Sequence, residues 1–194
     1  KKIIIHHDYN IGIRKKVREL TFNEINKINQ TRICEIPTLD RIEKILHKVK
    51  FLNIEIKTET LFSENIEENI AEFLIRNQIE NKTIVSSFNP IVLKKIKKIN
   101  KKIFIGHLYS KEGVPWYLKT KLWVYYSRPN SFHPDIKYIN ENIINWAKRK
   151  NMRIFVFTIN TKEELKKVKK FKVNGLFTDN PAKIKSYIQK EELF

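Results

Sequence analysis

Several residue types are scarce in this sequence, and each scarcity argues against a class of protein. Its single cysteine, Cys34, cannot form an internal disulfide and fits a reducing compartment such as the cytoplasm. The four glycines form no glycine-rich dinucleotide-binding turn after any expected strand. No apolar run reaches the length of a membrane span, and no secretory signal is visible. We therefore expect a cytoplasmic protein.

Acidic residues are also scarce. The 21 Asp and Glu stand against 39 Lys and Arg, which gives a formal net charge of +18. A basic protein attracts nucleic acid, anionic lipid surfaces and phosphorylated substrates. The lysines, however, are spread along the faces of expected helices, and no nucleic-acid-binding motif accompanies them. We expect no specific nucleic-acid partner, whereas an anionic membrane surface is a partner that the charge allows.

What is present is a regular alternation of strands and helices. The 194 residues, of which 41% are hydrophobic, suffice for one domain, residues 1–194, with a sizeable core. From residue 52 onward, apolar segments alternate with helical patterns, which predicts parallel βαβ units. Residues 122–126 fit either a strand or a buried helical turn. The expected strands cover residues 52–57, 83–88, 103–109, 131–133, 153–160 and 173–179.

Start signals mark the expected helices. Capping boxes lie at residues 21–24 and 161–164, and Asn89-Pro90 marks the start of a helix over residues 91–99. A helical pattern also covers residues 39–49, with apolar positions at 39, 42, 45, 46 and 49. Ser63 is expected to cap a helix whose apolar stripe is Ile66, Ile70, Phe73 and Leu74.

Polar residues gather where the expected strands end. Residues 2–8 are predicted to form a first strand that ends in His6-His7-Asp8. Carboxyl ends of strands form the active-site face of a (β/α)₈ TIM barrel, so we expect that α/β fold class. An open doubly wound sheet is the competing architecture, and the absence of a glycine-rich turn argues against it. The later polar strand ends are Lys57, Thr58, Ser86, Ser87, His107, His133, Thr158, Asn160, Thr178 and Asp179.

The segment 52–57 carries two charges on an otherwise apolar strand. Successive strand side chains point to opposite faces, so Glu55 and Lys57 share one face while Ile54 and Ile56 share the other. On a strand buried on both sides, such charges would cost roughly several kcal/mol each unless a partner uses them. A metal, a phosphate or a catalytic group is such a partner. The alternative is a half-exposed strand with a surface Glu–Lys pair.

Seven segments also follow one another in a family-specific order. They are a strand ending in His-Asp (3–8), Val-x-Glu-Leu-Thr-x-x-Glu-Ile (17–25), Ile-Pro-Thr-Leu (36–39), Asn-Ile-Glu-Ile-Lys (53–57), Ser-Ser-Phe (86–88), Phe-Thr-Ile-Asn (157–160) and a closing segment with Gly, Thr-Asp and Pro (173–181). In this order they resemble the glycerophosphodiester phosphodiesterase family, and the resemblance covers nearly the whole chain.

The resemblance implies a TIM barrel that hydrolyses small glycerophosphodiesters to an alcohol and glycerol 3-phosphate with a divalent cation, Ca²⁺ or Mg²⁺. The catalytic histidine of the His-Asp motif corresponds to His7, which fits the motif's spacing better than His6. A metal-ligating glutamate of the family corresponds to Glu55, and a phosphate-contacting lysine corresponds to Lys57. Phe157 stands where the family has tryptophan, and we assign it to substrate binding.

The sequence departs from the family at its front. The family's His-Arg-Gly strand and its Glu-x-Asp strand do not occur in these residues. A TIM barrel needs about 250 residues, so we expect about two N-terminal βα units to be missing. Ca²⁺ and Mg²⁺ sites use several oxygen ligands, so Glu55 alone would bind an ion weakly. The alternative function is therefore a catalytically impaired barrel that binds phosphorylated ligands or anionic lipid head groups.

Overall fold

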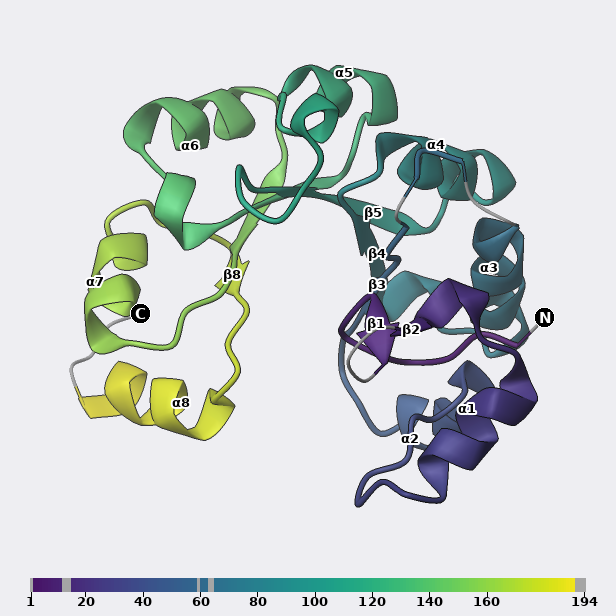
Figure 1. The fold of residues 1–194 in the computed structure, drawn as a ribbon. Coiled ribbons are helices and arrows are strands. Elements are labelled where there is room, and N and C mark those ends of the chain that lie inside the picture. Colours follow the sequence, from purple (N-terminus) through teal and green to yellow (C-terminus); the bar gives the residue numbers. More distant parts are fainter. Residues whose placement is uncertain (1, 12–14, 59, 63–64, 191–194) are drawn as a thin grey trace.

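Six parallel strands form a curled sheet in the computed structural model, which describes residues 2–11, 15–58, 60–62 and 65–190. The sheet order, β3-β4-β5-β6-β7-β8, follows the chain, and helices line the outer side (Figure 1). This repeat of strand and crossover helix confirms the predicted α/β fold of the TIM-barrel type. The strands are β3 (Leu52–Glu55), β4 (Thr83–Ser87), β5 (Phe104–Tyr109), β6 (Ser131–Pro134), β7 (Arg153–Val156) and β8 (Gly175–Leu176).

Two of the helices between the strands begin where the start signals predict. At the start of α4 the Asn89 side chain accepts hydrogen bonds from two backbone N–H groups, and the capping box of Thr161 and Glu164 opens α7. Residues 122–127 are helical, which settles the open alternative for that segment. None of the helices in the described ranges is long and apolar enough to cross a membrane. The helices of the sheet are α3 (Ile66–Arg76), η3 (Glu80–Lys82), α4 (Pro90–Ile99), η4 (Trp116–Leu118), α5 (Leu122–Ser127), η5 (Ile136–Tyr138), α6 (Glu141–Arg149), α7 (Lys162–Lys169) and α8 (Pro181–Lys190).

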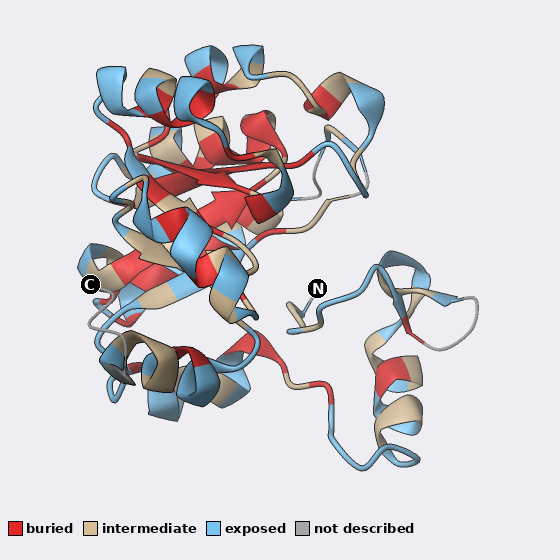
Figure 2. Ribbon diagram, turned by 90° about the vertical axis from the view of Figure 1, so that its left-hand side faces the viewer, coloured by how far each residue is buried: buried red, intermediate tan, exposed pale blue. Residues whose placement is uncertain are grey.

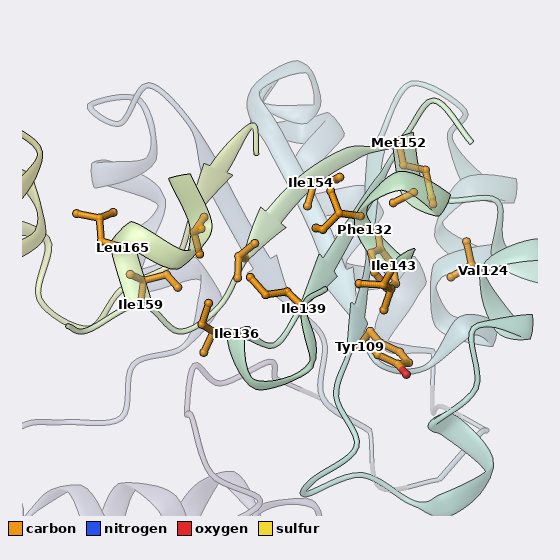
Figure 3. Close-up of a cluster of buried hydrophobic side chains, with 14 of the residues drawn as sticks. Tyr109, Val124, Phe132, Ile136, Ile139, Ile143, Met152, Ile154, Ile159 and Leu165 are labelled. Atoms are coloured by element: carbon orange, nitrogen blue, oxygen red, sulfur yellow. The ribbon is translucent and has the colours of Figure 1, made fainter. Parts of the chain in front are cut away.

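The hydrophobic core lies between the sheet and these outer helices. Figure 2 shows the buried residues concentrated in the strands, whereas the outward helix surfaces are exposed. One cluster includes Phe132 of β6 and Ile154 of β7, packed with residues of α5, α6 and α7 (Figure 3). A second cluster includes Val85 and Ile105, packed with residues of α3 and α4. Each fully buried side chain of this kind contributes about 1.5–3 kcal/mol, so the strands and helices stabilise one another.

The N-terminal part of the chain does not extend the parallel sheet, so the prediction of a first strand over residues 2–8 is wrong. Ile4 forms only an isolated antiparallel bridge with Thr38. The Ile5 N–H donates to the Pro37 carbonyl at 2.8 Å, and the Leu39 N–H donates to the Ile3 carbonyl at 2.9 Å. These bonds tie residues 3–5 to the segment around Thr38 instead of to β3.

The remaining N-terminal elements form a small unit beside the sheet (Figure 1). The two short strands pair with each other in antiparallel orientation, and the predicted capping box of Thr21 and Glu24 opens the first helix. Ile11, Ile25 and Ile36 form the buried cluster of this unit. The elements are β1 (Asn10–Ile11), β2 (Lys15–Lys16), η1 (Val17–Glu19) and α1 (Phe22–Asn29).

The helix predicted over residues 39–49 is shorter and less buried than its pattern indicates. It consists of η2 (Leu39–Ile42) followed by α2 (Glu43–Leu46). Ile45 and Val49 are 53% and 39% exposed, because a 3₁₀ turn has about three residues per turn and rotates the later positions away from the core. The last two strands are likewise shorter than the predicted ranges 153–160 and 173–179. The predicted Ser63 cap lies outside the described residues.

Candidate active site

The carboxyl ends of the strands meet at one rim of the sheet, and their inward-facing side chains form layers there. The strand registers pair Glu55 with Ser86, Ser86 with Gly106, and Gly106 with Ser131. A Cβ atom on Gly106 would lie 2.5 Å from the His133 ring, which shows that both residues face the inside of the curl. This rim is where a TIM barrel carries its catalytic groups.

Glu55, the last residue of β3, and Lys57, two residues beyond it, lie together on the inward side of the sheet. The Lys57 ammonium lies 3.6 Å from the Glu55 carboxylate, and the two side chains are 25% and 31% exposed, respectively. Ile56 is 3% exposed and belongs to the outer core, as the predicted alternation requires. The pair is therefore partly shielded from water, which strengthens its electrostatic action on a bound anion compared with a fully solvated pair.

His7 and Asp8 form a hydrogen-bonded pair near the start of the chain. The His7 Nδ1 atom lies 2.8 Å from Asp8 Oδ1, and the two side chains are 86% and 72% exposed. The hydrogen bond from His7, followed by the attraction of His7, His6 and Lys57, lowers the pKa of Asp8 against the opposing effect of burial. An ionised carboxylate can only accept, so Nδ1 of His7 donates this bond, and Nε2 is the ring nitrogen left to exchange a proton with a ligand.

His6 is held differently from its neighbour. Its Nε2 atom lies 3.1 Å from the backbone carbonyl of Asn10, and because a carbonyl only accepts, Nε2 must donate. This bond ties His6 to β1. Of the two adjacent histidines, His7 is thus the one that pairs with a carboxylate.

A model of the glycerophosphoryl diester phosphodiesterase family matches residues 1–183. The chain belongs to this family. A glycerophosphodiester phosphodiesterase of Caldanaerobacter subterraneus subsp. tengcongensis is 29% identical over an alignment of 183 positions, which covers 90% of this chain and 73% of the relative. Another from Bacillus altitudinis is 25% identical over an alignment of 197 positions, which covers 93% of this chain and 78% of the relative.

Solved structures of phosphodiesterases share the fold. A glycerophosphoryl diester phosphodiesterase from Silicibacter pomeroyi superposes with a TM-score of 0.79 at 14% identity, over 97% of this chain and 79% of its own. A phosphodiesterase from Oleispira antarctica, solved with the product sn-glycerol-3-phosphate, superposes with a TM-score of 0.73 at 20% identity. That superposition covers 96% of this chain and 79% of the Oleispira chain.

Phe157, the substrate-binding residue predicted from the family, lies at the rim beyond the end of β7. Its ring meets the ring of Phe88, which follows β4, edge to face with centroids 6.2 Å apart. The pair spans the inside of the curl and gives the rim an apolar wall. Its part in substrate binding is a prediction, as are the catalytic role of His7 and the ligand roles of Glu55 and Lys57.

Two other histidines at strand ends are buried and neutral. His107 lies on the helix side of β5, since its neighbours Ile105 and Tyr109 belong to the outer core, and burial lowers its pKa to about 4. His133 faces inward between the rings of Phe155 and Phe177. Burial, and secondly the charge of His107, lower the pKa of His133 to about 3. Neither can serve as the acid near neutral pH.

Sequence reasoning missed the rim role of Asn89. Asn89 is buried, with 2% of the residue exposed. Its Nδ2 atom donates to Thr58 Oγ1 and to the carbonyls of Thr60 and Leu61 at 2.9–3.1 Å. The same residue caps α4 through Oδ1. The sequence indicates the cap, whereas the contacts with the segment after Lys57 require the pairing of β3 and β4.

The described residues do not by themselves supply the oxygen ligands of a divalent cation. No group of three or more His, Cys, Asp and Glu side chains comes together in this part of the chain. Glu55 is instead paired with Lys57, whose positive charge competes with a cation. A hard cation such as Ca²⁺ or Mg²⁺ takes about six or more oxygen ligands, so one carboxylate does not fit it.

Proposed function

We propose that this protein hydrolyses glycerophosphodiesters to an alcohol and glycerol 3-phosphate. Family membership supports the reaction class, and the fold it shares with the Oleispira phosphodiesterase, which holds sn-glycerol-3-phosphate, supports the product. The observation that carries the proposal is the pair of Glu55 and Lys57 at the barrel rim. A phosphodiester is an anion, and a partly shielded ammonium attracts it to this point of the rim.

The proposed roles follow from the charges. Hydrolysis adds water across a P–O bond, so the departing alkoxide must gain a proton and the phosphorus must gain a hydroxyl. The Lys57 ammonium stabilises the negative charge that builds on the phosphoryl oxygens. His7, held by Asp8 through Nδ1, exchanges a proton through Nε2. Phe157 and Phe88 form the wall against the alcohol part of the substrate.

A divalent cation requirement is a separate prediction. If an ion binds, Glu55 is the carboxylate at the rim that would contact it, and the ion would supply positive charge at the phosphate. The described residues offer too few ligands for this, so the roles above are assigned without the ion. The single cysteine, which is exposed and unpaired, supports a reducing compartment such as the cytoplasm.

The test is phosphorus NMR of glycerophosphocholine incubated with the protein, with and without chelator. The proposal predicts that the diester signal is replaced by that of glycerol 3-phosphate. Appearance of phosphocholine would mean that the other ester bond is cut, and would contradict the proposal. Binding of glycerophosphocholine without any turnover, with or without added Ca²⁺ or Mg²⁺, would instead support the impaired barrel that only binds phosphorylated ligands.

A further inference from the structure

An aromatic ridge lies on the outside of the barrel, formed by η4, α5 and their connection. We define it as Trp116, Tyr117, Leu122, Trp123, Tyr125 and Tyr126. Helix α5 lies between α4 and α6 (Figure 1), and Trp146 of α6 adjoins the ridge through Tyr125, whose hydroxyl accepts from Trp146 Nε1 at 3.2 Å. All three tryptophans of the sequence are therefore gathered here.

The ridge presents apolar surface that the core does not use. Trp116 is 82% exposed and Leu122 is 71% exposed, while Tyr125 and Tyr126 are about half exposed at 50% and 46%. Large apolar side chains in solution are unfavourable singly and more so in a group, and a group of them on one surface marks an interaction site. Tryptophan and tyrosine combine an apolar ring with a polar atom, and they are enriched at boundaries between an apolar region and water.

The rings are fixed before any partner arrives. Trp123 Nε1 donates to the Tyr117 carbonyl at 2.6 Å, which ties α5 to η4. Trp116 and Tyr117 meet edge to face at 5.8 Å, and Trp123 and Tyr126 do so at 5.9 Å. Side chains already held in place lose little conformational freedom on binding, so the surface is preorganised.

The charged residues within the segment that forms the ridge are all basic. No acidic residue occurs between Glu112 and Asp135, a stretch that holds Lys119, Lys121 and Arg128. Glu112 itself is paired with Lys137 at 2.6 Å. The ridge therefore combines exposed apolar rings with positive charge. It complements a surface whose outer layer is anionic and whose interior is apolar.

We propose that the aromatic ridge docks the protein on an anionic lipid bilayer, with Trp116 and Leu122 inserted at the interface and Lys119 and Lys121 at the lipid phosphates. The connection that carries Trp116 leaves the carboxyl end of β5, so the ridge begins at the same rim as Lys57. This inference goes beyond the proposed hydrolysis and does not depend on it.

A lipid surface fits the ridge better than nucleic acid does. Bases stack on free ring faces, but lysine ammonium groups already cover three rings: Lys94 over Tyr126, Lys150 over Tyr125 and Lys121 over Trp146, at 4.8–5.8 Å from the ring centres. The second most exposed side chain of the ridge, Leu122, is aliphatic and cannot stack. An aliphatic side chain beside tryptophan is suited to an acyl-chain boundary.

The test is co-sedimentation of the protein with vesicles of phosphatidylcholine alone or mixed with phosphatidylglycerol. We expect binding to the mixed vesicles, weakened by salt, and about tenfold weaker binding of the double variant Trp116→Ala/Leu122→Ala. The matched control is Phe51→Ala, because Phe51 is 74% exposed but precedes β3 at the opposite end of the sheet. Lys119→Gln/Lys121→Gln should also weaken binding, whereas Lys101→Gln/Lys102→Gln should not.

Three results would overturn the proposal. They are no sedimentation with mixed vesicles, equal losses in the ridge variants and the Phe51 control, and binding of single-stranded RNA that the Trp116→Ala/Leu122→Ala variant loses while vesicles are not bound. Circular dichroism of each variant confirms that a loss of binding is not a loss of fold. The substituted side chains are largely exposed, so the fold should persist.

Discussion

The Lys57 ammonium and the Glu55 carboxylate lie 3.6 Å apart at the carboxyl end of β3, on the inward side of the sheet. Each restrains the other, and together they present one positive and one negative group to the barrel rim.

An anionic ligand should approach through Lys57. We expect Lys57→Gln to weaken binding of glycerol 3-phosphate about tenfold, because one charge-assisted contact is lost. Isothermal titration measures the change, and Lys101→Gln at the other end of the sheet is the control. Equal affinities of Lys57→Gln and wild type would remove Lys57 from the site.

Asn89 links the cap of α4 to the segment that follows Lys57, and two substitutions separate these roles. Asn89→Ala removes both, and we expect it to lower the free energy of unfolding by about 2 kcal/mol or more through the lost cap and the buried bonds. Asn89→Ser keeps a capping acceptor for the first-turn N–H groups but removes the Nδ2 donor to Thr58, Thr60 and Leu61. It should retain more stability than Asn89→Ala and still raise KM. If both variants unfold at the same urea concentration, the cap does not contribute separately.

Gly106 is required by the close approach of His133. A Cβ at residue 106 would lie 2.5 Å from the imidazole and 3.0 Å from Ser131 Oγ. Gly106→Ala should therefore destabilise the fold by about 1–3 kcal/mol, the usual range for overpacking. Urea denaturation measures the change. In the background His133→Ala the clash is absent, so the same substitution should cost much less, and an unchanged cost would show that the clash is not its source.

Stability should decrease as the pH falls below 6.5. Burial lowers the pKa of folded His107 to about 4 and of His133 to about 3, from 6.5 in the unfolded chain. The unfolded chain therefore takes up protons first, and each histidine lowers the free energy of unfolding by about 1.4 kcal/mol per pH unit below 6.5. The loss ends for each residue once the pH passes below its folded pKa.

Urea denaturation between pH 7 and pH 5 measures this slope. The lowered pKa values of Asp8, Glu24 and Glu112 act at lower pH, because an unfolded carboxyl titrates near 4. The variant His107→Leu should show about half of the wild-type slope. The control variant His47→Gln, which changes an exposed side chain, should show the full wild-type slope. A slope that is the same in all three proteins would mean that His107 is not buried in its neutral form.

The sequence predicts the sheet well because its βα rhythm and its caps are local signals. Asn89, Thr161 and the alternation around Glu55 appear in the structure where the pattern places them. The first strand is different, because the apolar run 3–5 reads as a strand whichever neighbour it pairs with. The run pairs with the segment at Thr38, and this pairing depends on tertiary contacts that the sequence of the run does not indicate.

The candidate site could likewise be predicted from the sequence only in part. Strand period alone places Glu55 and Lys57 on a shared face, and their family roles come from the motif around them; the sheet register shows that this face is the inward one. The burial of His107 and His133 could not be predicted from the sequence, because it depends on tertiary contacts. His107 is enclosed on the helix side of the sheet, whereas His133 faces inward between Phe155 and Phe177. The links from Asn89 to the residues after β3 likewise depend on tertiary contacts.

The most direct test of the site is kcat/KM for glycerophosphocholine in wild type and Glu55→Gln, with Glu72→Gln on the exposed surface of α3 as the control. Gln keeps the size of the Glu55 side chain but removes its charge. We expect a loss of about tenfold to a hundredfold at Glu55, because the Lys57 ammonium that stabilises the phosphoryl oxygens loses the carboxylate that holds it in place, and no loss at Glu72. Equal kcat/KM values in wild type and Glu55→Gln would contradict the assignment of the β3 rim as the active site.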